Sequence, residues 1–121
     1  MEGPSYSAAF SRLGVELLTP SEADRVLVDR VIFDELTRGV ISDGSRAEYL
    51  RVIAALSREG CDAVALGCTE IPLLVTPADS PLPTLDSTRL LAHEAVTAAL
   101  GKRPLPTWRG GRDHVLRASN A

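Results

Sequence analysis

The sequence has few aromatic residues, no excess of basic residues and no long apolar run. Aromatic residues make up 4% of the 121 positions, which argues against a surface that stacks on nucleic-acid bases. The net charge is −3, from 13 Lys and Arg against 16 Asp and Glu, whereas proteins that bind phosphate backbones are usually basic. No apolar run approaches the roughly 18 residues that a membrane span needs. We therefore expect neither a nucleic-acid partner nor a membrane span.

Cysteine is also scarce. Cys61 and Cys68 are the two cysteines, too few for the disulfide framework of a small secreted protein. The first residues lack the basic and apolar stretches of a secretory signal. Neither Cys-x-x-Cys nor His-x-x-x-His occurs, so no zinc site is predicted, and no Walker loop, GxGxxG or GxSxG motif occurs. The simplest interpretation is a cytoplasmic protein with two free thiols and no metal.

The remaining composition is that of a globular protein, with 45% hydrophobic and 24% charged residues. Ala63-Val64-Ala65-Leu66 is unbroken in its apolarity, which predicts a strand covered on both faces, as in a parallel sheet. Ser45 with Glu48 matches the capping box that begins a helix. Apolar periodicity and turn residues predict helices over 5–13, 21–38, 45–60, 71–75 and 86–100, and strands over 15–18, 63–66 and 84–85.

This alternation predicts an α/β fold, an incomplete three-layer sandwich with a short parallel sheet. Three strands are few for an open sheet, and no strand precedes the first helix. We therefore expect residues 1–100 to form an α/β domain truncated at its N-terminus, and residues 101–121 to form a mobile basic tail. An incomplete sheet exposes an edge that invites pairing, so a homodimer is possible.

The strongest candidate site is Gly67-Cys68-Thr69-Glu70, which lies where a buried strand ends and a helix begins. Ligands of open α/β sheets bind at this end of the strands. Gly67 suits a sharp turn or a close approach to a ligand, and a helix N-terminus favours the thiolate form of Cys68. Thr69 can cap the helix, and the free N–H groups of its first turn can bind a carboxylate. The alternative is a small buried cysteine at the end of a strand.

The other polar positions favour structural roles. Asp86-Ser87-Thr88 and Thr19-Pro20-Ser21-Glu22 follow predicted strands and could bind a small ligand, although helix capping is the simpler explanation. Cys61 is expected to be an inert packed thiol. His93 is expected to pack or lie on the surface, and no role is predicted for His114 in the tail.

The segment from Ala63 to Leu74 resembles the second catalytic-cysteine motif of the aspartate/glutamate racemase superfamily. The resemblance extends to Val31–Leu36 with Gly39, to Ser45-Arg46 with Tyr49, and to Pro83–Thr88. The set of motifs is most similar to the broad-specificity amino-acid racemases and covers about residues 1–100.

This resemblance implies two pseudo-symmetric α/β domains with the active site between them. One thiolate removes the α-proton of an amino acid and the opposite thiol returns a proton to the other face, without pyridoxal phosphate, metal or another cofactor. Cys68 matches the second of these residues. Thr69 matches a residue that holds the substrate carboxylate, and Gly67 and Glu70 complete the substrate-binding motif.

The chain also departs from the family pattern. Members are about twice as long, and many carry a histidine where this chain has Leu91. The first domain and its cysteine are missing, so the resemblance implies an isomerase half that needs the N-terminal racemase domain in cis or in trans. Two alternatives remain: a non-catalytic remnant that binds carboxylates, and a related hydantoin racemase or maleate isomerase.

Overall fold

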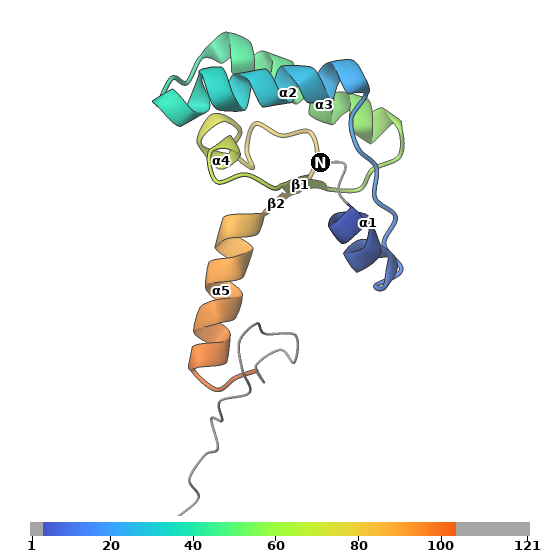
Figure 1. Cartoon of the computed structure of the whole chain (residues 1–121), viewed down its shortest axis with the longest axis vertical. Helices are drawn as coiled ribbons and strands as arrows, with labels where there is room; N and C mark the ends of the chain where they lie inside the picture. The colour runs from blue at the N-terminus through green and yellow to red at the C-terminus, as the bar shows by residue number, and fades with distance from the viewer. Residues whose placement is uncertain (1–3, 104–121) are drawn as a thin grey trace, which may run out of the picture.

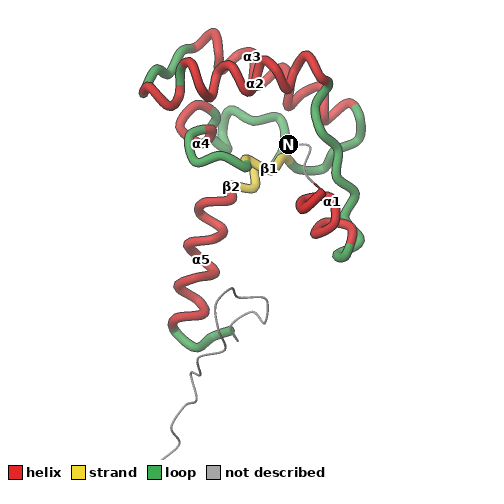
Figure 2. The backbone as a smooth tube through the Cα atoms, viewed as in Figure 1, coloured by secondary structure: helices red, strands yellow, loops and turns green. Residues whose placement is uncertain are grey.

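The computed structural model describes residues 4–103 as an α/β fold (Figures 1 and 2). The elements in chain order are α1 (Pro4–Ser11), α2 (Glu22–Asp34), the 3-10 helix η1 (Leu36–Arg38), α3 (Asp43–Arg58), β1 (Val64–Leu66), α4 (Ile71–Leu74), β2 (Thr84–Asp86) and α5 (Ser87–Ala99). The expected α/β class with a short parallel sheet is confirmed. Most of the predicted tail lies outside the described residues. No helix in residues 4–103 has both the length and the apolarity needed to cross a bilayer.

The sheet consists of β1 and β2, which run parallel and pair Val64 with Thr84 and Leu66 with Asp86. The connection between them runs through α4. Both strands overlap the segments 63–66 and 84–85 that the sequence predicted as strands. Because the strands are parallel and in register, their carboxyl ends lie at the same edge of the sheet.

Two expectations about the sheet are wrong. Residues 15–18 form no strand, and Val15 and Leu18 are 47% and 39% exposed. A strand needs a neighbour for its N–H and C=O groups, and the described residues place none beside this segment. Nor is the sheet covered on both faces, since Ala65 is exposed and Leu85 is 43% exposed.

The core lies between the sheet and the layer formed by α2 and α3, which pack side by side (Figure 1). Tyr49 on α3 is buried and donates its hydroxyl hydrogen to the Val28 carbonyl of α2 at 3.0 Å. Burial raises the pKa of the Tyr49 phenol, so the hydroxyl stays a donor. The buried apolar residues are Val28, Val31, Leu36, Tyr49, Val52, Ile53, Leu56, Leu66, Ile71, Leu74, Val75 and Leu82.

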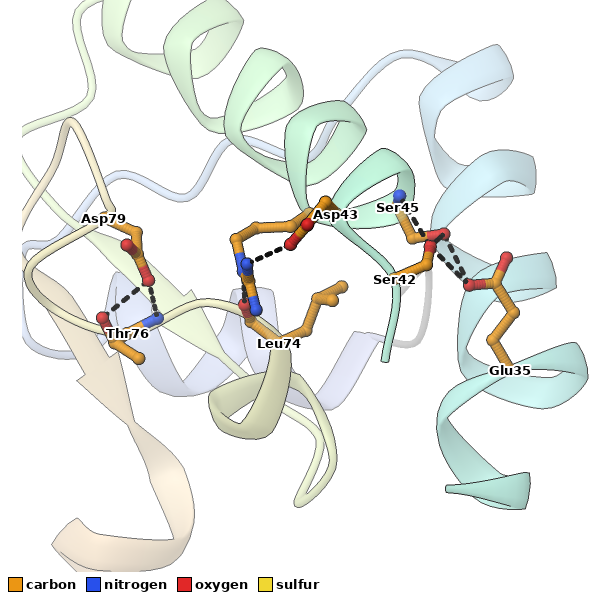
Figure 3. A network of polar contacts seen from close by, with 8 residues as sticks. Glu35, Ser42, Asp43, Ser45, Leu74, Thr76 and Asp79 are labelled. Carbon is orange, nitrogen blue, oxygen red and sulfur yellow. Dashed lines mark hydrogen bonds and ion pairs between the residues drawn. The ribbon is translucent and has the colours of Figure 1, made fainter. Parts of the chain in front are cut away.

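The third helix starts earlier than the capping box predicted. Ser42, not Ser45, is the N-cap of α3, and its side chain accepts the Ser45 N–H at 3.1 Å. Ser45 is buried instead and donates its hydroxyl hydrogen to Glu35 (Figure 3). The capping-box prediction was wrong because the Ser45 hydroxyl donates its hydrogen bond to the carboxylate of Glu35, which precedes η1. In the same region Arg46 donates to the Leu74 carbonyl at 2.9 Å and ties α3 to α4.

Replacing Ser42 by alanine should lower the free energy of unfolding by about 1 kcal/mol, because α3 loses its N-cap. Urea denaturation measures this change. Ser57→Ala, at an exposed position of the same helix, is the matched control and should stay within about 0.5 kcal/mol of the parent. Equal midpoints for the two variants would contradict the assignment of the cap.

The predicted helix over 21–38 is interrupted. It ends as α2 at Asp34, and the 3-10 turn η1 follows and stops at Gly39, whose φ of 73° is in the left-handed region. Such a conformation is open to glycine and costly for most other residues. The break places Leu36, the first residue of η1, in the core, where it is 4% exposed.

Candidate functional site

The two strand-end segments meet at the carboxyl edge of the sheet. Leu66 and Asp86 pair as the last residues of β1 and β2. The Ser87 hydroxyl donates to the Leu66 carbonyl at 2.9 Å, which fixes the start of α5 against the end of β1. The structure thus brings together Gly67–Glu70 and Asp86–Thr88, two of the three segments that the sequence marked as candidates.

Cys68 lies two residues beyond the end of β1. Its side chain is half-buried and packs against the edge of the hydrophobic core. The residues on either side, Gly67 and Thr69, are exposed. The sulfur is therefore partly desolvated at the surface of the domain and is not sealed in its interior.

The Cys68 thiol donates to the Glu70 carboxylate, with Sγ 2.9 Å from Oε2. Partial burial raises the pKa of Cys68, and the hydrogen bond to Glu70 raises it further. The backbone N–H groups of Glu70 and Ile71 act in the opposite direction, but they do not outweigh these effects. The expectation of a thiolate is therefore wrong: α4 has only four residues and a weak dipole, and a carboxylate faces the sulfur.

Glu70 is the charged centre of the motif. It accepts hydrogen bonds from the Cys68 thiol and from the Thr69 hydroxyl at 2.6 Å, and these lower the pKa of its carboxyl group. Thr69 consequently does not cap α4, whose N-cap is Glu70 without a side-chain cap bond. The motif thus presents a thiol and a hydroxyl that both donate to one carboxylate.

Gly67 does not serve a turn. Its φ is not positive, and a Cβ placed there would meet no atom within 4 Å. Nothing in the described residues requires glycine at this position. The open space at the Gly67 Cβ position leaves the other expected reason, a close approach of a ligand, as a prediction.

Replacing Glu70 by glutamine should lower the pKa of the Cys68 thiol, because the carboxylate that stabilises the protonated form loses its charge. Alkylation of Cys68 by iodoacetamide should then proceed at lower pH, and mass spectrometry in a Cys61→Ser background measures this. Glu59→Gln removes the same charge from an exposed position and should leave the profile unchanged. An unshifted Glu70→Gln profile would mean that the carboxylate does not control the thiol.

The other candidate residues serve the fold. Asp86 caps α5 by accepting the N–H groups of Thr88 and Arg89 at 3.0 and 3.1 Å. Ser21 caps α2 in the same way and lies far along the chain from either strand.

The remaining chemistry-bearing side chains lie apart from the motif. Cys61 is a free thiol packed against the core, as expected. His93 is exposed on α5, and His114 lies outside the described residues. Within residues 4–103, no group of three His, Cys, Asp or Glu side chains could hold a metal ion.

A groove of about 340 Å³ opens beside β2 and the start of α5. Leu66 and Pro72, which flank the motif, line it, whereas Cys68 does not. Arg89 also lines the groove and pairs with Asp86 at 3.3 Å. Arg89 was not among the predicted site residues; its place three residues after the N-cap Asp86, at the end of a strand, was the available signal. The groove therefore borders the residues on either side of the motif, and the Cys68 thiol does not line it.

Comparison with known proteins finds a protein family and a similar solved structure. The sequence profile of the family described as Asp/Glu/Hydantoin racemase matches residues 2–95. A crystal structure of a protein from Yersinia pestis, proposed to be an Asp/Glu racemase, is similar with a TM-score of 0.77 and 40% sequence identity. The match covers 82% of this chain and 44% of that protein, so this chain spans less than half of its length.

Proposed function

Because the chain belongs to the Asp/Glu/hydantoin racemase family, we propose that it is one half of a cofactor-independent amino-acid racemase in which Cys68 is one of two acid/base residues. The observation that supports this most is the position of Cys68: half-buried, at the carboxyl end of β1, between exposed neighbours. A sulfur in this position is accessible to a small ligand. It is also partly shielded from water, which favours direct proton exchange with that ligand.

Because the pKa of Cys68 is raised, we assign the protonated form to the resting state, in which Cys68 acts as the acid. A protonated thiol is an acid, so Cys68 delivers its proton to the α-carbon while a base on the opposite face removes the original α-hydrogen. After one turnover Cys68 is a thiolate, the opposite base carries the proton, and the reverse reaction restores both. Two groups are needed because a single base would mainly return the proton to the face it left.

The neighbouring groups suit the two charged ends of an amino acid. The Glu70 carboxylate complements an α-ammonium group, and the exposed Thr69 hydroxyl and adjacent backbone suit an α-carboxylate. Gly67 leaves space for the ligand to approach the backbone. Substrate binding would replace the present hydrogen bonds between these residues.

The proposed organisation follows from the same reasoning. Residues 1–100 form the C-terminal racemase domain, and the opposite base comes from an N-terminal domain supplied in cis or in trans. A role in D-amino-acid metabolism and a cytoplasmic location belong to this proposal. A homodimer is the alternative partner arrangement.

The test uses a chimera in which this chain replaces the part of the Yersinia pestis protein that it matches. Circular dichroism should show loss of optical activity from L-aspartate, L-glutamate or another small amino acid. Racemisation of hydantoins or isomerisation of maleate, without racemisation of amino acids, would assign that reaction to the protein instead. A folded chimera that binds amino acids but changes none of these substrates would favour the non-catalytic remnant and contradict the proposal.

A further inference from the structure

Helix α4 is too short to hold its own position. It has four residues, no side-chain bond caps its N-terminus, and it follows the Cys68 motif directly. A single helical turn has little stability of its own, so contacts with the rest of the fold must fix it. The place of Glu70, which is the N-cap of α4 and accepts the Cys68 thiol hydrogen, therefore depends on those contacts.

Two kinds of contact fix α4 in the fold. Ile71 and Leu74 are buried in the core and supply apolar contacts, which have no fixed direction. A directional contact comes from Arg46 on α3, whose Nε donates to the Leu74 carbonyl at 2.9 Å (Figure 3). A carbonyl at the C-terminal end of a helix has no partner within the helix, so the guanidinium satisfies a group that α4 itself cannot.

The guanidinium of Arg46 also acts on the two segments beside α4. It pairs with Asp43, in the first turn of α3, at 2.6 Å. Beyond α4, the Asp79 carboxylate accepts the N–H and the hydroxyl hydrogen of Thr76. These bonds lower the pKa of Asp79, and the nearby charge of Arg46 lowers it further. Arg46 thus links the start of α3 to the end of α4 and to the turn that follows.

We propose that Arg46 is a positioning residue for the thiol site: by fixing α4, it keeps the Glu70 carboxylate within hydrogen-bond distance of the Cys68 sulfur. The contacts run from Arg46 to the Leu74 carbonyl, along the single turn of α4, and from the N-cap Glu70 to Sγ at 2.9 Å. The importance of Arg46 for racemisation rests on the proposed function, whereas its effect on the thiol is independent of that function.

Alkylation of Cys68 by iodoacetamide, measured against pH in the full chain with Cys61→Ser, tests this role. The midpoint of the profile reports protonation of the thiol, and the plateau at high pH reports access to the sulfur. Arg46→Met should move the midpoint to lower pH, in the direction expected for Glu70→Gln. Relative to the plateau, the rate at neutral pH should rise about two- to tenfold, the range for loss of one hydrogen bond from the thiol.

Arg51→Met is the matched control. Arg51 is also on α3 and forms ion pairs with Asp24 and Glu48, neither of which is on α4. Loss of a merely structural arginine should therefore leave the midpoint of the parent chain unchanged. Arg46→Lys retains a donor for the Leu74 carbonyl and should return the midpoint toward that of the parent.

A double variant tests whether Arg46 acts through the carboxylate. Glu70→Ala removes the carboxylate and its hydrogen bond with the thiol together. Adding Arg46→Met to Glu70→Ala should therefore move the midpoint no further, since the two residues act on the thiol as one unit.

Each outcome bears on one proposal. An unchanged midpoint for Arg46→Met, an equal shift for Arg51→Met, no recovery with Arg46→Lys, or a further shift in the double variant would overturn the positioning role. An Arg46→Met chain that does not fold would also overturn it, because Arg46 would then support the whole domain. The expected midpoints in a chimera that does not racemise amino acids would contradict the proposed function and leave the positioning role intact. Racemisation with an unshifted Arg46→Met midpoint would do the reverse.

Discussion

Replacing Cys68 by serine lowers the racemisation rate of the chimera by about 10²–10⁴-fold, the usual contribution of one general acid or base. A serine hydroxyl is a much weaker acid than a thiol, so it neither delivers a proton to the α-carbon nor returns as a base at neutral pH. The fold should be unaffected, because Cys68 is only half-buried and serine is similar in size. The rate is followed by circular dichroism with the substrate identified for the parent chimera.

Cys61→Ser is the matched control for this loss. Cys61 is also a free, partly buried thiol packed against the same core, seven residues earlier in the chain. It lies before β1 rather than after it and should keep the parent rate within about twofold, since changes outside the reacting groups have small effects. Equal rates for Cys68→Ser and the parent would remove Cys68 from the chemistry.

Replacing Leu74 by alanine should lower the free energy of unfolding by about 2–5 kcal/mol, the range for a buried leucine. Leu74 is fully buried under the α2–α3 layer, and its carbonyl accepts the hydrogen bond from Arg46. A loss of this size is a large share of the roughly 5–15 kcal/mol that stabilises a small domain. Because α4 follows the Cys68 motif directly, the substitution should also loosen the thiol site.

The neighbouring residue provides the control. Leu73 is 61% exposed, so Leu73→Ala removes the same atoms from the same helix without opening a cavity. Urea denaturation of both variants measures the difference. Similar destabilisation by the two substitutions would contradict the burial of Leu74 beneath α3.

Local sequence signals predicted the elements that local physics controls. The apolar run before Gly67 and the short pair before Asp86 marked both observed strands, and Asp86 caps the last helix as expected. Gly39 and Gly60 end their segments with positive φ, which glycine tolerates. These features depend on neighbours a few residues away, so they were predictable.

The failures involve partners that lie far along the chain. Residues 15–18 have the apolarity of a strand but no neighbouring strand in the described residues. Ser45 matched a capping box, yet Glu35 determines its hydrogen bond.

The thiol of Cys68 was expected to be ionised. The Glu70 side chain instead accepts a hydrogen bond from the thiol, and the pKa of Cys68 is raised by partial burial and by this bond. Residue spacing alone does not specify the orientation of the Glu70 side chain. The motif itself was found from its position at the end of a strand, which the structure reproduces, and from its resemblance to a family, which the comparisons support.

Solvent deuterium incorporation at the α-carbon tests the role of Cys68 most directly. In heavy water the chimera should give product enantiomer that carries deuterium while unreacted substrate keeps its hydrogen, and Cys68→Ser should suppress this incorporation where Cys61→Ser does not. Product that retains the original hydrogen, or incorporation that is the same with and without the Cys68 sulfur, would show that this thiol does not exchange a proton with the substrate.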